Sequence, residues 1–390
     1  MVLHSQSSGG RTDRAPGSPF AFARGRLPPR GKAVRLAENN RPIRSPRMRQ
    51  RIRALPGPCA GQVNKEPAMI PERYARYEKF VTLGAVNFTC TPGDKAANLA
   101  KIETNMREAA AQGVNILAFP EEALTGCGGC VPCREGADHC DYHAGLAETV
   151  PGPSTERVAA LARELDLYVA FGMIERDADD PSVLYNASAF VGPEGIQGTY
   201  RKVHLGTLPW VTEGITFKPG RSLPVFETRF GPVGVIICYD FWFNPEPTRI
   251  MALKGARVIL NTCASFNGPY KRDNMLAVTC TRAQENCVYT VSANQVAGAP
   301  RAESYAAGEV EATRSGNFAG NSVIAGPDFP AFARPYAVAG QDEQLISATV
   351  SFEKLHRWES IFPWRDWRAG RLSATSELIA DEFSNLVHGA

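Results

Sequence analysis

The feature that most constrains the fold is an alternation of short apolar runs with longer amphipathic segments, which begins at Lys79. Residues 80–88 and 115–119 are predicted to be buried strands, and the segment 94–112 between them has apolar residues at helical spacing. The alternation continues, with helices predicted at 154–165, 247–254 and 271–285 and strands predicted at 167–172, 184–192, 198–202, 233–238, 257–261, 288–293, 321–324 and 344–350. This order predicts a single-domain, layered α/β sandwich.

The N-terminal segment differs in composition from the rest of the chain. Residues 1–64 carry twelve Arg and one Lys against Asp13 and Glu38, a net charge of +11, although the whole chain has only +3. The segment is rich in Pro, Gly, Ser and Arg and lacks an apolar period, so we expect residues 1–70 to be a disordered extension without nucleic-acid binding. It resembles a transit peptide in composition, but we favour an upstream start codon read in place of Met69.

Composition also excludes several classes of protein. No run of about 18 apolar residues occurs, so we expect neither a membrane span nor a membrane partner. Ten cysteines in 390 residues without a secretory signal indicate a reducing, cytoplasmic compartment, where thiols are catalytic, metal-bound or buried. Three of them fall in predicted core elements and are expected to be small buried hydrophobes, namely Cys263, Cys280 and Cys287.

Three predicted strands each end in a reactive side chain. Glu121 follows an apolar strand and Pro120, Lys202 ends the strand 198–202, and Cys238 ends a strand of five apolar residues. Taken singly, these residues could be a capping carboxylate, a surface lysine and a buried thiol. Together, at the ends of strands where α/β proteins build their sites, they predict an active site.

The three segments resemble the Glu-Lys-Cys motifs of the nitrilase superfamily, the carbon–nitrogen hydrolases. The resemblance runs from about residue 80 to about residue 351 and includes Phe119-Pro120-Glu121, Arg201-Lys202-Val203-His204-Leu205, Cys238-Tyr239-Asp240 and the segments 252–256, 282–286, 294–296 and 320–322. It implies a hydrolase domain at 79–352 with a four-layer α-β-β-α sandwich fold, paired into homodimers or larger homo-oligomers.

The resemblance also implies roles for the site residues. Glu121 is the expected base, Lys202 the catalytic lysine, Cys238 the nucleophile, and Glu213 a second glutamate that steadies the site. The chemistry fits these residue types, because an amide carbonyl resists attack and requires a thiolate that a neighbouring base can generate. Lys202 and the backbone N–H of Tyr239 would stabilise the oxyanion, each donor contributing roughly 3 kcal/mol. No cofactor is expected for catalysis.

Two departures from the family pattern concern the site. Glu122 follows Glu121 where the family more often has an uncharged residue, so the base could be either glutamate, and we favour Glu121 because it directly follows the proline. The segment from Asp240 to Glu246 is one residue longer than usual, which affects the substrate loop.

The nucleophile motif indicates the reaction. Cys-Tyr-Asp resembles the amidases and N-carbamoyl amine hydrolases of the family, whereas nitrilases more often have Cys-Trp-Glu. Phe241-Trp242-Phe243 stand where carbamoylases acting on amino acids often have arginines, which favours a small-molecule substrate with an uncharged or aromatic acyl group. A nitrilase and a non-catalytic binding module on the same fold are the alternatives.

Four closely spaced cysteines follow the Glu121 segment: Cys127, Cys130, Cys133 and Cys140. Spacings of two residues suit a tetrahedral metal site, and structural zinc is the metal that the sequence favours, with His139 and His143 nearby. A loop of reduced thiols is the alternative.

The C-terminal tail, 353–390, contains Trp358, Trp364 and Trp367 among charged residues. Aromatic side chains at this density usually pack against a surface, either that of a second subunit or that of the same domain. His204 is expected to be a packed, hydrogen-bonded structural residue rather than a base.

Overall fold

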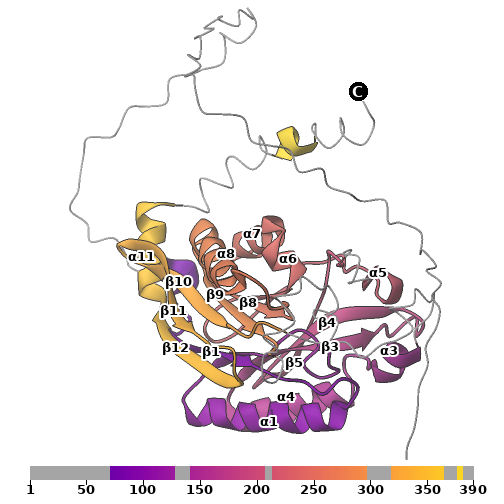
Figure 1. Cartoon of the computed structure of the whole chain (residues 1–390). Helices are drawn as coiled ribbons and strands as arrows, with labels where there is room; N and C mark the ends of the chain where they lie inside the picture. Colours follow the sequence, from indigo (N-terminus) through magenta and orange to yellow (C-terminus); the bar gives the residue numbers. More distant parts are fainter. Residues whose placement is uncertain (1–70, 128–140, 207–212, 297–317, 364–375, 381–390) are drawn as a thin grey trace, which may run out of the picture. The chain divides into compact units, whose positions relative to one another are not determined.

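The computed structural model describes residues 71–127, 141–206, 213–296, 318–363 and 376–380; the extension 1–70 lies outside them. These residues form two mixed six-stranded sheets (Figure 1). The first has the strand order β12 (Gln344–Ser351), β1 (Phe80–Asn87), β2 (Ile116–Ala118), β3 (Tyr168–Arg176), β4 (Leu184–Gly192) and β5 (Gly195–Arg201). The second has the order β11 (Ala331–Val338), β10 (Val323–Asp328), β9 (Tyr289–Asn294), β8 (Val258–Cys263), β7 (Val233–Ile237) and β6 (Val225–Phe226).

Most of the described helices connect or flank these strands. They are the 3-10 turn η1 (Glu72–Tyr74) and the helices α1 (Lys95–Ala111), α3 (Asp141–Leu146), α4 (Pro153–Leu165), α5 (Glu213–Thr216), α6 (Tyr239–Trp242), α7 (Pro245–Leu253), α8 (Lys271–Asn286) and α11 (Phe352–Ile361). The long helix α1 begins at the cap residue Asp94, whose carboxylate accepts a hydrogen bond of 3.0 Å from the N–H of Ala97. Among the described segments, no helix is both long and apolar enough to cross a membrane.

The central strands of each sheet are parallel. β1, β2 and β3 pair in parallel in the first sheet, and β7, β8 and β9 do so in the second, whereas the flanking pairs are antiparallel. Parallel strands end at the same edge of a sheet. The residues that follow β1, β2 and β3 therefore lie at one edge of the first sheet, and those that follow β7, β8 and β9 lie at one edge of the second.

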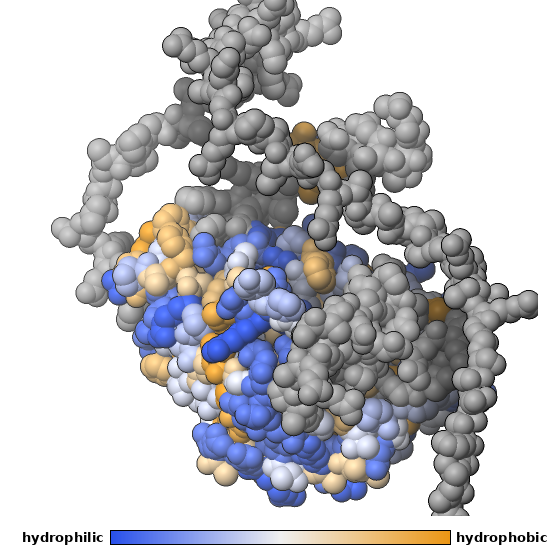
Figure 2. Space-filling model, in the orientation of Figure 1, coloured by the Kyte–Doolittle hydropathy of each residue, from blue (hydrophilic) through white to orange (hydrophobic). Residues whose placement is uncertain are grey.

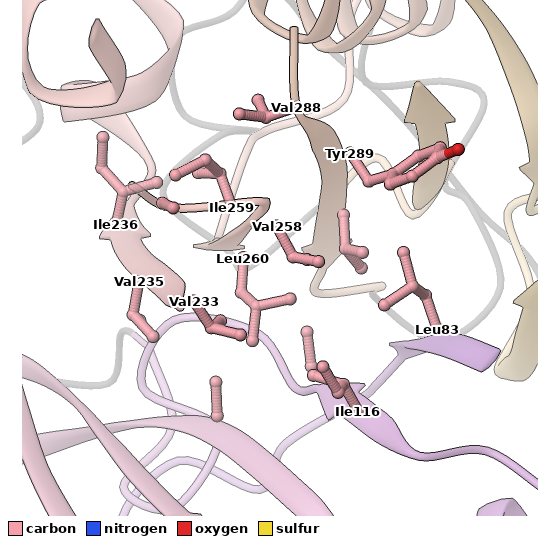
Figure 3. Packing of buried hydrophobic residues seen from close by; sticks show 14 of the residues in the cluster. Leu83, Ile116, Val233, Val235, Ile236, Val258, Ile259, Leu260, Val288 and Tyr289 are labelled. Atoms are coloured by element: carbon pink, nitrogen blue, oxygen red, sulfur yellow. The ribbon is translucent and has the colours of Figure 1, made fainter. Parts of the chain in front are cut away.

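The main core lies between the two sheets. In Figure 3 the side chains of Val233 and Leu260 point from the second sheet toward Leu83 and Ile116 of the first sheet. All four residues are fully buried. Alternate residues of the second sheet, such as Ile259, point to its opposite face, as the period of two in a strand requires.

Helices cover the outer faces of both sheets. A second buried cluster joins Ile102 and Met106 of α1 and Val158 of α4 to Leu117 and Val169 of the first sheet. Helices α7 and α8 pack on the second sheet, so that in Figure 1 α1 and α4 lie below the sheets and α6 to α8 above them. This arrangement confirms the predicted four-layer α-β-β-α sandwich.

Trp358 of the C-terminal tail packs within this chain. Its ring stacks on that of Phe332 at a centroid distance of 4.7 Å, and it joins Phe352 and Leu355 of α11 in the main core. Trp364 and Trp367 lie outside the described residues. The surface shown in Figure 2 is mostly hydrophilic, with hydrophobic residues gathered in patches.

Candidate active site

The structure brings the three predicted site residues to neighbouring strand ends. Glu121 follows β2 and Lys202 follows β5, both in the first sheet, whereas Cys238 directly follows β7 of the second sheet. Since the sheets face each other, the site forms where the carboxyl ends of strands from both sheets meet.

Lys202 is buried between two carboxylates. Its ammonium lies 2.8 Å from Oε1 of Glu121 and 2.7 Å from Oε1 of Glu213. The side-chain amide of Asn186 on β4 donates to the same two oxygens, at 2.8 Å and 2.9 Å. Burial lowers the pKa of Lys202, but the two carboxylates outweigh it and hold this pKa well above its usual range, so the ammonium stays charged.

The two carboxylates are fixed by backbone groups. The second oxygen of Glu121 accepts a hydrogen bond of 2.9 Å from the N–H of Ala264, just after β8. The main chain of Glu121 is held as well, because the side-chain amide of Gln295, just after β9, donates to its main-chain carbonyl at 2.8 Å. The N–H of Gly206 donates to the second oxygen of Glu213. Burial would raise the pKa of Glu213, but Lys202 outweighs burial and lowers this pKa, so the carboxylate stays charged beside the ammonium.

Cys238 occupies a tight turn between β7 and α6. Its φ of 42° lies in the left-handed region, which is uncommon for a residue with a Cβ and recurs at functional sites. Its N–H donates to the carbonyl of Thr262 and to Oδ1 of Asn261, both at 3.0 Å, which fixes the turn. Its Sγ lies 4.0 Å from the hydroxyl of Ser265.

The thiol of Cys238 is neutral at rest. Burial and the charge of Glu121 raise its pKa to about 12, although Lys202 acts in the opposite direction. A neutral thiol needs a base to remove its proton during attack. Tyr239, the first residue of α6, places its backbone N–H in the first turn, where helix N–H groups have no partner within the helix.

The structure distinguishes the two adjacent glutamates. Glu121 contacts Lys202, whereas the carboxyl of Glu122 lies beside the thiol of Cys127, whose Sγ is 4.0 Å from the main-chain oxygen of Glu121. Glu122 has a φ of 49° and is buried, and burial together with the charge of Glu121 raises its pKa to about 8. The backbone turn at Glu122 packs closely against Gly172, where a Cβ would come within 2.1 Å of the Glu122 nitrogen. A side chain at position 172 would therefore displace the turn.

The predicted cysteine cluster is described only at Cys127. Cys130, Cys133 and Cys140 lie outside the described residues, as does His139. In the parts of the chain that the structure describes, no group of three His, Cys, Asp or Glu side chains is placed to hold a metal ion. His143 stacks edge-on against Phe217 instead, and burial lowers its pKa to about 4.

Two further site residues escaped the sequence analysis. Asn186 lies in a run of buried residues of β4, where a polar side chain is unusual and could have been noticed, but its partners come from distant segments. Ser265 is 5% exposed, and only the fold places its hydroxyl beside Cys238.

The chain is similar in sequence and in fold to known proteins. The family model for carbon-nitrogen hydrolases matches residues 82–360. A nitrilase of Pyrococcus abyssi is 37% identical over 251 residues (64% of this chain, 81% of the relative), and an N-carbamoylputrescine amidase of Solanum lycopersicum is 31% identical over 300 residues (73% and 92%). The crystal structure of Saccharomyces cerevisiae Nit3, a member of branch 10 of the nitrilase superfamily, aligns with a TM-score of 0.58 at 23% identity and covers 74% of this chain and 96% of that one. The chain therefore belongs to the carbon-nitrogen hydrolases of the nitrilase superfamily.

Proposed function

We propose that the chain hydrolyses a non-peptide carbon–nitrogen bond of a linear amide or an N-carbamoyl amine through a thioester on Cys238. The observation that carries this proposal is the buried contact of Lys202 with Glu121 and Glu213, beside a cysteine in a left-handed turn. A pure binding module would not require a buried charge cluster of this kind next to a thiol.

The reaction begins with proton transfer. Glu121 takes the proton of Cys238 as Sγ attacks the carbonyl carbon, because a thiol with a pKa of about 12 forms no stable thiolate beforehand. The carbonyl oxygen gains a negative charge, which the ammonium of Lys202 and the N–H of Tyr239 stabilise. Lys202 can act in this way because its partners keep it charged.

The leaving group then departs and the enzyme is regenerated. The tetrahedral state collapses, the C–N bond breaks, and Glu121 returns the proton to the leaving nitrogen, which becomes ammonia or an amine. Glu121 next removes a proton from water, which attacks the thioester carbonyl. The carboxylic acid or carbamate leaves, and Cys238 recovers its proton.

We prefer an amide or N-carbamoyl substrate because the segment Cys238-Tyr239-Asp240 resembles the nucleophile motif of amidases. In addition, the Solanum lycopersicum relative is an N-carbamoylputrescine amidase. Hydrolysis of a nitrile is the second candidate function, and the similarity to the Pyrococcus abyssi nitrilase supports it. A nitrile would be attacked by the same thiol, so substrate assays must separate the two reactions.

A matched substrate panel tests the proposal. An aliphatic amide, an aromatic amide, their nitriles, an N-carbamoyl amine and an N-carbamoyl amino acid are incubated with the protein, and ammonia release is measured, with Cys238→Ala as the blank. We expect turnover of amides or the N-carbamoyl amine. Turnover of nitriles alone would identify a nitrilase, and a folded protein that consumes none of the panel would favour the binding module.

A further inference from the structure

Asp240 is a buried carboxylate two residues after Cys238, and its two oxygens accept four hydrogen bonds. Oδ2 accepts from the hydroxyl of Tyr200 at 2.6 Å and from the N–H of Val203 at 3.0 Å. Oδ1 accepts from the N–H of His204 and from its ring Nδ1, both at 2.7 Å. Asp240 is fully buried, so these bonds replace the solvation that a carboxylate requires.

The four donors lie on both sides of Lys202 in the sequence. Tyr200 belongs to the end of β5 in the first sheet, and residues 203 and 204 follow Lys202 directly, whereas Asp240 belongs to α6, which begins after β7 of the second sheet. One side chain thus joins the segment that carries the ammonium to the turn that carries the thiol.

We propose that Asp240 is a positioning residue that holds Lys202 in place relative to Cys238. This inference rests on the proposed function, because it assigns Asp240 to the oxyanion geometry of that reaction. Glu121 and Glu213 bind the ammonium itself, but neither belongs to the turn of Cys238. Asp240 supplies the direct connection between the two backbones.

A carboxylate is the only side-chain group of this size that can make all four bonds. In Asp240→Asn an NH₂ group replaces one of the two oxygens. This group is a donor, and it would face two other donors. The hydroxyl of Tyr200 could rotate and the ring of His204 could change tautomer, but the backbone N–H groups of Val203 and His204 cannot reverse. In either orientation of the amide, one backbone N–H faces another donor, and the segment after Lys202 must move.

The first experiment compares Asp240→Asn with a control that is destabilised elsewhere. Thr228→Val removes a buried hydroxyl that donates to the carbonyl of Gly231 at 2.6 Å, in the turn before β7. We expect Asp240→Asn, assayed at a temperature where it is folded, to lose about thirtyfold in kcat with KM changed less than about threefold, because the contact with the oxyanion exists only in the transition state. Thr228→Val should lose thermal stability and keep its kcat.

The second experiment needs no substrate. The positive charge of Lys202 favours the thiolate of Cys238, so its displacement should slow alkylation by iodoacetamide at pH 8, followed on the Cys238 peptide by mass spectrometry. We expect a loss of about tenfold in Asp240→Asn, a loss in Lys202→Ala, and no further loss in the double variant.

The outcomes separate the two proposals. A folded Asp240→Asn with kcat and alkylation rate within threefold of the parent would overturn the positioning role, as would losses that add in the double variant. The alkylation rates of the variants could follow the expected pattern while the parent protein hydrolyses no carbon–nitrogen substrate. That result would overturn the proposed function and leave the link between Asp240 and Lys202 intact.

Discussion

The substitution Glu122→Gln tests how the site handles its extra carboxyl group. Glu122 is buried, and its pKa of about 8 in the folded protein compares with 4.5 for an unperturbed glutamate. Between these two values the folded state holds a proton that the unfolded state has released. Stability of the parent therefore falls as pH rises from about 5 to 8 and is constant with respect to this group above that range.

The magnitude follows from the size of the shift. One bound proton corresponds to about 1.4 kcal/mol of unfolding free energy per pH unit, so by pH 7 the penalty reaches about 3 kcal/mol. Glutamine has nearly the same shape and does not titrate, so the variant should lack this part of the pH dependence. It should also keep substantial activity, because Lys202 contacts Glu121 rather than Glu122.

Urea denaturation of parent and variant between pH 5 and 9 measures the effect. The difference in unfolding free energy should be smallest at pH 5, should increase in favour of the variant up to pH 8, and should then level off. Parallel pH profiles would show that Glu122 is not held as a buried acid. An inactive Glu122→Gln combined with an active Glu121→Gln would reverse the roles given to the two glutamates.

Three further predictions concern the nucleophile, the lysine and the cysteine cluster. Cys238→Ser should be nearly inactive in the ammonia assay, because a hydroxyl has a far higher pKa than a thiol and Glu121 is too weak a base to ionise it; turnover near that of the parent would contradict this. Lys202→Ala should lose activity without accumulating an acyl adduct, since the first tetrahedral state loses its stabilising charge; an adduct seen by intact-protein mass spectrometry would show that Lys202 acts later. If Cys127, Cys130, Cys133 and Cys140 hold structural zinc, elemental analysis of protein purified without a metal-affinity step should find one zinc per chain, and a fully active metal-free preparation would exclude it.

The sequence predicted the parts of the fold that local patterns determine. The strands that precede Glu121 and Cys238, β2 and β7, are continuous apolar runs, which parallel strands with two buried faces require. Helix α7 was predicted from residue 247 but begins at Pro245, because proline suits the first turn and Asn244 precedes it as the cap residue. Strand β11 was missed, since it is an edge strand that contains Pro335 and has mostly exposed or half-exposed residues.

The contacts within the site depend on tertiary structure. Asn186 bridges Glu121 and Glu213 only because β4 lies beside β5 and begins at the edge of the sheet where β2 and β5 end. The sequence indicates Asp240 only as part of the nucleophile motif. Its hydrogen bonds to residues 203 and 204 join segments that are far apart in the sequence, so no local pattern predicts them. The sequence thus predicted which residues carry charge and reactivity, whereas the fold determines how they are held.

The thioester on Cys238 is the central claim, and intact-protein mass spectrometry of Glu121→Gln tests it most directly. Without its base this variant should acylate slowly and deacylate more slowly still, so incubation with an amide that the parent hydrolyses should add the mass of the acyl group to the intact protein. Peptide mapping after digestion should then place this added mass on Cys238. Cys238→Ala, which removes one sulfur atom and should cost at most about 2 kcal/mol of packing, should stay folded, form no adduct and release no ammonia. Turnover by Cys238→Ala near that of the parent, or an adduct on another residue, would contradict the account.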